Sequence, residues 1–414
     1  MITWIGWLLL RIAVGASAGG WGALAARVAV LPAPQAVVDL SDSAAVVYPG
    51  PGRTVPVGLL RRGVLVAVLE RLVSPDCTNG WLRVGEGAWI CGADHALRVD
   101  RPAAPPWPPP PERWAPLPFL YVHPLGHGRL LYDTPDDAVE RRNGRPFPPG
   151  TWESVMNDLR RAGTTLYRTV SGSYLRRDDV RETEPSALSG VFPDPAASPW
   201  PYGFVVEPDA DVYAEPPPKP RWASPRRAGL RLPRYAAVRV AEQGETWVRI
   251  GEERYLRRSD VRLFRLRPPP DGVGPAERWF DVDLGEQVFA AYEGPVPRFV
   301  TLASTGKGTL TPEGSFRIYR AAGTQTMRGI PTGDGRRTYE VRDVPWVMFF
   351  SDDRAIHGTF WHDEFGTPRS HGCINLAPAA ARWVFAFAAP ALPPGWQAIE
   401  PADATDGTLV HVHK

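Results

Sequence analysis

Trp279-Phe280-Asp281-Val282-Asp283-Leu284 begins a stretch in which short apolar segments follow one another closely. Four more such segments follow, at residues 287–292, 299–303, 311–318 and 344–350. Short apolar runs rich in Val, Phe and Trp and bounded by Gly, Pro or Ser are typical of β-strands. We therefore predict that the C-terminal third of the chain is mainly β-structure.

Two motifs follow these strands, His357-Gly358-Thr359-Phe360-Trp361-His362 and Ser370-His371-Gly372-Cys373-Ile374-Asn375. They place three of the eight histidines of the chain and one of its three cysteines close together in the sequence. The separation of His357 and Cys373 suits a strand, a loop and a return strand. This arrangement would bring the imidazole and the thiol together at the mouth of a pocket.

These residue types suit nucleophilic catalysis. A thiol with its ordinary pKa is a weak nucleophile at neutral pH, and a neighbouring imidazole activates it. Gly372 permits a tight turn beside Cys373, so that backbone N–H groups can face a developing oxyanion. Ser370 and His371 would brace this loop, and Asn375 would orient it.

The same residues resemble the L,D-transpeptidase catalytic domain of the YkuD type over residues 278–414. The resemblance rests on the family motif [ST]-H-G-C-x-[NR], which is residues 370–375 here. The His357-Gly358 pair supports it, together with more distant matches at residues 304–306, 311–316, 381–382 and 392–396.

The resemblance implies a β-rich fold with a short helix at residues 377–387 and no cofactor. Cys373 would be the nucleophile and His357 the group that accepts and returns the proton, with the oxyanion bound by the backbone around Gly372 and Cys373. The substrate would be a peptidoglycan tetrapeptide stem. Attack on the carbonyl of its third residue would release D-alanine, and transfer to an amine would give a 3→3 cross-link or attach the stem to a protein.

Three alternatives stay open at this point. The segment between His357 and Ser370 is shorter than in many family members, so His362 is a second candidate for the base, unless it shapes the pocket rim with Trp361. His357, His362, His371 and Cys373 also have the donor chemistry of a zinc site, although their spacing is uncommon for one and we expect no metal. Finally, the protein could bind the cell wall while its C-terminal domain is inactive or acts as an L,D-carboxypeptidase.

The middle of the chain contains a repeat. Three stretches at nearly constant spacing share an aromatic or apolar strand and end on Asp, at residues 88–94, 173–179 and 254–260. The alternation of residues 247–256 around a Gly251-Glu252-Glu253-Arg254 turn predicts a β-hairpin. These units resemble bacterial SH3-like modules, which bind cell-wall peptides or space out a catalytic domain.

The predicted fold is therefore mainly β, with tandem SH3-like barrels before the catalytic domain. We expect modules at residues 39–100, 118–183, where the resemblance is weak, and 203–265. Linkers at 101–117, 184–202 and 266–277 would join them to each other and to the catalytic domain at 278–414. The first linker is rich in proline, including Pro108-Pro109-Pro110-Pro111, and should be a stiff spacer.

Cys77 and Cys91 lie in the first module, on either side of the hairpin around Trp81. In an exported chain they could be cross-strand neighbours joined by a disulfide. The alternative is two buried free thiols. Pairing would leave Cys373 as a free thiol.

The first 38 residues have the composition of a signal peptide or an N-terminal membrane anchor, with apolar runs at 2–10 and 12–26 around Arg11. We therefore expect an exported protein of the periplasm or cell envelope, in contact with the membrane only if this segment is retained. Its expected partners are peptidoglycan stem peptides and, through the SH3-like modules, the wall. The net charge of +2 in 414 residues does not suggest a nucleic-acid partner.

Overall fold

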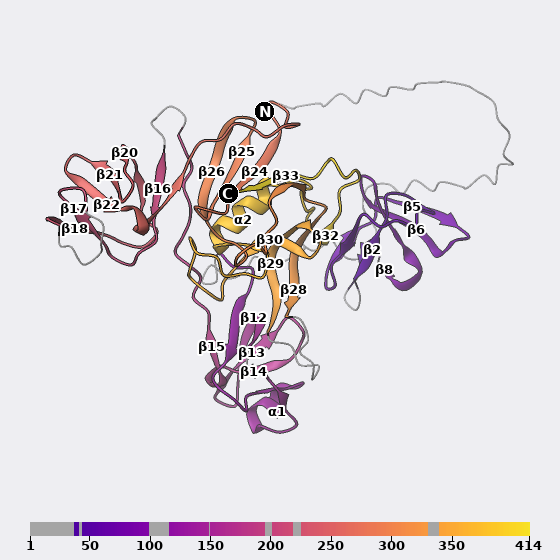
Figure 1. Cartoon of the computed structure of the whole chain (residues 1–414). Coiled ribbons are helices and arrows are strands. Elements are labelled where there is room, and N and C mark those ends of the chain that lie inside the picture. The colour runs from indigo at the N-terminus through magenta and orange to yellow at the C-terminus, as the bar shows by residue number, and fades with distance from the viewer. Residues whose placement is uncertain are drawn as a thin grey trace, which may run out of the picture.

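The computed structural model confirms the prediction of a mainly β protein (Figure 1). The structure describes residues 37–40, 44–98, 116–148, 150–194, 201–217, 225–329 and 339–414. Apart from two residues each, the predicted N-terminal segment 1–38 and linker 101–117 lie outside this part of the chain. Among the described residues, no helix is both long enough and apolar enough to cross a bilayer.

The C-terminal domain consists of two sheets that share one strand. Its elements are β24 (Arg278–Asp283), β25 (Val288–Glu293), β26 (Val296–Ser304), β27 (Gly314–Arg317), β28 (Arg320–Arg328), β29 (Glu340–Ser351), β30 (Arg354–Gly358), β31 (Ile374–Leu376), α2 (Pro378–Phe387), β32 (Trp396–Ile399) and β33 (Leu409–His413). One sheet has the order β26-β25-β24-β33-β27 and the other β26-β31-β30-β29-β28-β32.

Helix α2 packs into the core of this domain, where residues 377–387 were predicted to be helical. Pro378 stands in its first turn, where the missing N–H costs no hydrogen bond. Ala380, Ala381 and Val384 are fully buried in the same core cluster as Phe280 and Phe289 from the first sheet and Ile356 from the second. The helix therefore helps to hold the two sheets around one apolar core.

The three upstream modules are separate β units, seen in indigo, magenta and red in Figure 1. The first contains β1 (Val37–Asp39), β2 (Ala45–Val47), β3 (Gly58–Leu60), β4 (Leu65–Ala67), β5 (Glu70–Ser74), β6 (Cys77–Gly85), β7 (Ala88–Cys91) and β8 (Ala96–Arg98). The second contains β9 (Leu120–Pro124), β10 (Leu130–Leu131), α1 (Pro135–Glu140), β11 (Arg145–Pro146), β12 (Thr151–Arg161), β13 (Thr164–Thr169), β14 (Tyr174–Arg176) and β15 (Val180–Glu182). The third contains β16 (Tyr202–Val205), β17 (Ala210–Tyr213), β18 (Arg227–Leu232), β19 (Ala237–Arg239), β20 (Glu242–Gln243), β21 (Trp247–Gly251), β22 (Arg254–Arg257) and β23 (Val261–Phe264).

The repeated sequence forms the same structure in each module. An antiparallel hairpin, β6–β7, β13–β14 or β21–β22, is followed at once by a single 3₁₀ turn at Gly92–Asp94, Arg177–Asp179 or Arg258–Asp260. The hairpin predicted at 247–256 is therefore confirmed, with Val248 opposite Leu256. The SH3-like assignment of the modules stays a prediction.

Short helix α1 in the second module was not predicted from the sequence. The Thr134 side chain caps it by accepting a hydrogen bond from the Asp137 N–H (3.1 Å), and Pro135 occupies the first turn. The helix has only six residues, so its apolar period is too short to read from sequence. Arg141, just after α1, pairs with the buried final Asp179 of the repeat (3.1 Å).

Each module packs against the C-terminal domain. Strand β3 of the first module pairs with β32, and a side chain at Gly58 would collide with the Trp396 ring, 2.4 Å away. Strand β12 of the second module pairs in parallel with β29. From the third module, Phe204 and Phe264 share a core cluster with Trp279 of β24.

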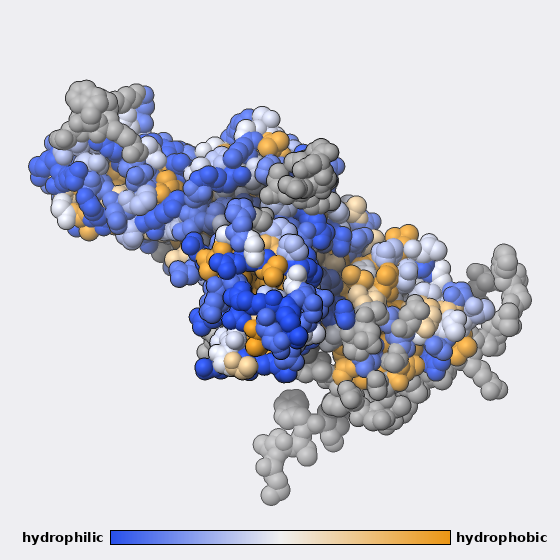
Figure 2. Space-filling view, turned by 90° about the horizontal axis from the view of Figure 1, so that it is seen from below, coloured by the Kyte–Doolittle hydropathy of each residue, from blue (hydrophilic) through white to orange (hydrophobic). Residues whose placement is uncertain are grey.

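Segment 184–202, expected as a linker, also contacts the C-terminal domain in its described part. Val191 and Val300 exchange two backbone hydrogen bonds (2.8 and 2.9 Å), and Leu188 is buried. The Phe192 ring contacts the rings of Phe299 and Trp383 at an angle. Exposed apolar side chains are instead prominent on the first module, where Val55 and Val73 are about 70% exposed and where Figure 2 shows orange surface at the right.

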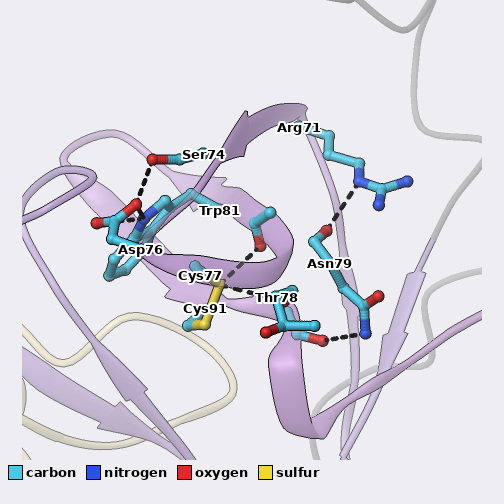
Figure 3. Close-up of a disulfide and its surroundings, with 10 residues drawn as sticks. Arg71, Ser74, Asp76, Cys77, Thr78, Asn79, Trp81 and Cys91 are labelled. Carbon is cyan, nitrogen blue, oxygen red and sulfur yellow. Dashed lines mark hydrogen bonds between the residues drawn. A yellow bond between two sulfur atoms is a disulfide. The ribbon is translucent and has the colours of Figure 1, made fainter.

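Cys77 and Cys91 form a disulfide at the base of the β6–β7 hairpin (Figure 3). Their Cα atoms are 5.7 Å apart, and Trp81 of β6 lies opposite Cys91 in the strand register. The Trp81 indole N–H is 3.2 Å from the Asp76 carboxylate. Cys373 is the free cysteine.

We predict that the double variant Cys77→Ala/Cys91→Ala destabilises the first module by about 3 kcal/mol, the loop-closure estimate for a bridge of this sequence separation. Urea unfolding followed by tryptophan fluorescence measures the change. As a control, the unreduced wild-type protein should expose one titratable thiol in denaturant. Three thiols in that titration, or an unchanged urea midpoint in the variant, would contradict the prediction.

Candidate functional site

A cavity of about 510 Å³ opens in the C-terminal domain beside Cys373. It is lined by Trp152, Gln325, Thr326, Met327, Arg328, Tyr339, Val341, Phe349, Asp353, Arg354, His357, Trp361, His362, Arg369, Ser370, His371, Cys373 and Asn375. Seven of the nine predicted site residues are on this wall. Gly358 and Gly372 lie in the backbone next to His357 and Cys373 but do not line the cavity.

Strands β30 and β31 bring His357 and Cys373 together. The two strands are parallel, with Ile356 opposite Ile374 and His357 opposite Asn375. Side chains alternate along a strand, so Cys373, two residues before Asn375, shares the face of His357. A return strand was predicted, but β31 runs parallel to β30, so the prediction was wrong in direction. β31 lies between β30 and β26 and pairs with both strands.

His357 is buried, with its Nδ1 atom held by the protein. Nδ1 lies 3.3 Å from the Gly358 carbonyl oxygen and 3.2 Å from Thr359 Oγ1. The carbonyl can only accept, so Nδ1 carries the proton and Nε2 is left with a lone pair. Burial lowers the pKa of His357 to about 4, and the hydrogen bond to the Gly358 carbonyl only partly opposes this shift. At neutral pH this imidazole is therefore a neutral base.

The Cys373 thiol is protonated in the same environment. Burial raises its pKa above the usual range, and a hydrogen bond from the Ala355 backbone only partly opposes this effect. A neutral imidazole beside a protonated thiol favours removal of the proton during attack on a substrate. It does not favour a thiolate–imidazolium pair that exists beforehand.

The loop before Cys373 is held tightly. Ser370 Oγ accepts a hydrogen bond from the Gly372 N–H (3.0 Å) and donates one to the Cys373 carbonyl (2.6 Å). Gly372 has φ +132°, and a Cβ there would lie 2.8 Å from the Leu310 carbonyl oxygen, so only glycine fits. The Gly372 N–H is thus already used in a hydrogen bond within the loop. This bond to Ser370 Oγ would have to break before the N–H could bind an oxyanion.

Thr311 connects this loop to the neighbouring one. Its hydroxyl donates to the Gly372 carbonyl (2.9 Å) and accepts from the Gly306 N–H (2.8 Å). Two further backbone hydrogen bonds join the Thr305 carbonyl to the N–H groups of Arg369 and Ser370. The matches at residues 304–306 and 311–316 therefore correspond to a brace for the cysteine loop.

His362 and Asn375 contact each other at the side of the cavity. His362 Nε2 lies 3.0 Å from Asn375 Nδ2, and its Nδ1 accepts a hydrogen bond from the Glu364 N–H (3.3 Å). Both ring nitrogens of His362 therefore have a polar neighbour, whereas the His357 ring is held through Nδ1. The geometry favours His357 as the base and places His362 at the pocket wall.

Aromatic rings occupy the positions around the two motifs. Trp361 stacks on His357, with ring centroids 5.6 Å apart. His371 is exposed, and its ring lies 6.1 Å from that of Tyr339. In the described part of the chain, no group of three or more His, Cys, Asp or Glu side chains is arranged to hold a metal ion.

Eleven of the lining residues were not predicted as site residues from the sequence, and Arg354 and Trp152 are two of them. Arg354 donates a hydrogen bond to the Leu310 carbonyl (2.9 Å) and pairs with Asp352 (3.0 Å). Arg354 lies on the same strand as His357, three residues earlier, and this spacing could have indicated it as a site residue. Trp152 comes from the second module, and nothing in its local sequence indicates that it reaches this cavity.

Comparison with known proteins gives one family and several structural relatives. Residues 277–412 match the YkuD family, described as the L,D-transpeptidase catalytic domain. No curated protein matches the chain.

The similar solved structures are L,D-transpeptidases. A mutant enzyme of Enterococcus faecium is 25% identical and is matched over 33% of this chain and 50% of its own, with a TM-score of 0.26. The catalytic domain of the E. faecium enzyme is 26% identical over 33% of this chain and 98% of its own (TM-score 0.26). L,D-transpeptidase 3 of Mycobacterium tuberculosis is 21% identical over 34% and 62% (TM-score 0.27).

This chain thus spans half the length of the first of these enzymes and nearly all of the isolated catalytic domain. Residues 277–412, which contain His357 and Cys373, match the YkuD family of L,D-transpeptidase catalytic domains.

Proposed function

We propose that this protein is a peptidoglycan L,D-transpeptidase with Cys373 as nucleophile and His357 as general base. The observation that carries the proposal is the pairing in one cavity of a free thiol with a buried neutral imidazole whose Nε2 is left to accept a proton. The match of residues 277–412 to the L,D-transpeptidase catalytic domain family supplies the reaction class.

In the first half-reaction, Cys373 Sγ attacks the carbonyl carbon of the third residue of a tetrapeptide stem while its proton passes to His357 Nε2. The C–N bond to the terminal D-alanine then breaks. His357 returns its proton to the leaving amine, and a thioester remains on Cys373. The Gly358 carbonyl stabilises the transient imidazolium because it accepts from Nδ1–H.

In the second half-reaction, an amine of another stem attacks the thioester and gives its proton to His357. The C–S bond breaks, the proton returns to sulfur, and a 3→3 cross-link forms. The acceptor could equally be a protein amine, or water in an L,D-carboxypeptidase. This chemistry supports a location in the periplasm or cell envelope, where stem peptides are found.

We predict that a carbapenem acylates the wild-type protein at Cys373 and that Cys373→Ala abolishes both the adduct and the release of D-alanine. His357→Ala should slow D-alanine release by about 10²- to 10⁴-fold, the usual contribution of a general base. Intact mass and muropeptide chromatography measure the two effects. His411→Ala is the matched control, since this histidine of β33 is outside the cavity and should leave the rate unchanged.

The same chromatogram identifies the acceptor. A cross-linked dimer shows transfer to a stem, and a tripeptide alone shows hydrolysis. D-alanine release by Cys373→Ala, or a wild-type protein that pellets with cell walls but forms neither adduct nor product, would contradict the proposal. The second outcome would support the wall-binding alternative.

The lowered pKa of His357 predicts an unusually acidic limit for activity. Protonated His357 cannot accept the thiol proton, so acylation should fall only below about pH 4. The raised thiol pKa should keep the rate level up to at least about pH 8. Carbapenem acylation rates measured across pH test this profile, with recovery of activity checked after return to neutral pH. A loss of activity already at about pH 6.5 would mean that the pKa of His357 is not perturbed.

A further inference from the structure

Trp152 is the one described residue on the cavity wall that does not belong to the C-terminal domain. It lies near the start of β12 in the second module, which the sequence suggested only as a spacer or a wall-binding unit. In Figure 1 this module lies below the C-terminal domain, with β12 near the lower end of β28. The position of this module therefore affects the shape of the cavity.

The docking of the second module is specified by directional contacts. Thr151 and Trp152 pair in parallel with Glu340 and Val341 of β29, beyond the end of β30. The Glu340 N–H donates to the Gly150 carbonyl (3.2 Å). Backbone hydrogen bonding thus fixes the register that presents Trp152 to the cavity.

Buried polar side chains strengthen this interface. The carboxylate of Glu153, only 1% exposed, lies 2.8 Å from Arg342 Nε. The Ser154 hydroxyl donates to the Asp343 carboxylate, and the Tyr121 hydroxyl donates to the Asp343 carbonyl (2.6 Å). A shift of the module would separate the Ser154 and Tyr121 hydroxyls from their acceptors in Asp343 and would break the ion pair of Glu153 with Arg342, which makes a shift costly.

The Trp152 ring extends an aromatic series that ends on the base. Its centroid is 5.9 Å from that of Phe360, Phe360 is 5.0 Å from Trp361, and Trp361 stacks on His357. His123 lies 4.5 Å from Trp152 and supports it from within the second module. Trp152 itself is only half-buried, so part of its ring faces the cavity.

Part of the neighbouring wall is apolar. Met327, Val341 and Phe349 line the cavity and pack in or against the same cluster as Trp152. The nearby cations are already neutralised, since Arg328 pairs with Glu340 (2.8 Å) and Arg369 with Glu364. This apolar part of the wall suits an aliphatic chain.

We propose that the second module completes the reaction cavity and that Trp152 packs against the aliphatic side chain of the stem peptide. This inference rests on the proposed function for the identity of the ligand. Trp152 is then a substrate-binding residue supplied by a domain outside the catalytic family match.

The test measures binding separately from turnover. In a full-length Cys373→Ala background, calorimetry with a disaccharide tetrapeptide should give a Kd about tenfold higher for Trp152→Ala than for its parent, the loss expected for one well-packed aromatic contact. Trp152→Phe should stay within about threefold of the parent. Met156→Ala is the control, because Met156 is on the same strand but is exposed and outside the cavity.

A second readout separates substrate contact from support of His357. In the active protein, Trp152→Ala should raise the KM for D-alanine release about tenfold. Acylation by a carbapenem, which lacks the stem side chain, should change by less than about threefold. An equal loss of both reactions would show that Trp152 acts through Phe360 and Trp361, and would overturn the inference.

An unchanged Kd in Trp152→Ala would also overturn it. Failure of the proposed function looks different: the wild-type protein would form no adduct and release no D-alanine, while the calorimetric comparison of the two variants could still be made. A wild-type protein that turns over while Trp152→Ala keeps its Kd and KM would reject only the role of Trp152.

Discussion

The parallel pairing of β30 with β31 is the constraint on which the rest of this site depends. It places His357 opposite Asn375, with Cys373 on the same face, and burial at this junction keeps the imidazole neutral and the thiol protonated. β31 is only three residues long, so its position also requires β26 on its other edge and the Thr311 hydroxyl that holds the Gly372 carbonyl. The chemistry thus depends on a short strand fixed from three sides.

The upstream modules are integrated with the catalytic domain through main-chain pairing and buried side chains. β3 pairs with β32 and extends the second sheet, and β12 pairs with the first residues of β29. In the third module, Arg258 pairs with Glu286 of the catalytic domain, whose other carboxylate oxygen accepts from the Leu263 N–H (3.0 Å). Modules that only spaced out the catalytic domain would not need contacts of this kind. We therefore infer that these contacts fix the positions of the modules against the domain.

Much of this could be predicted from local sequence. The strands of the C-terminal third, helix α2, the repeated hairpins and the residues of the cysteine motif depend on patterns a few residues long, and such patterns report periodicity and turn chemistry directly. Helix α1 was missed because six residues are too few to show a period. The direction of β31 was missed because the connection that follows Gly358 is long enough to lead to either a parallel or an antiparallel neighbour.

The sequence by itself determined the β-rich class of the protein, the repeat and the identity of the thiol and imidazole, since each depends on residue type and short-range spacing. Tertiary structure alone decided which nitrogen of His357 is held by the protein and that burial lowers the pKa of His357 and raises that of Cys373. It also decided that Trp152 joins a cavity whose other walls come from a distant part of the chain. Burial and register between distant strands set these properties. Neither is encoded in any single segment, because both arise only when separate segments exclude water from the space between them.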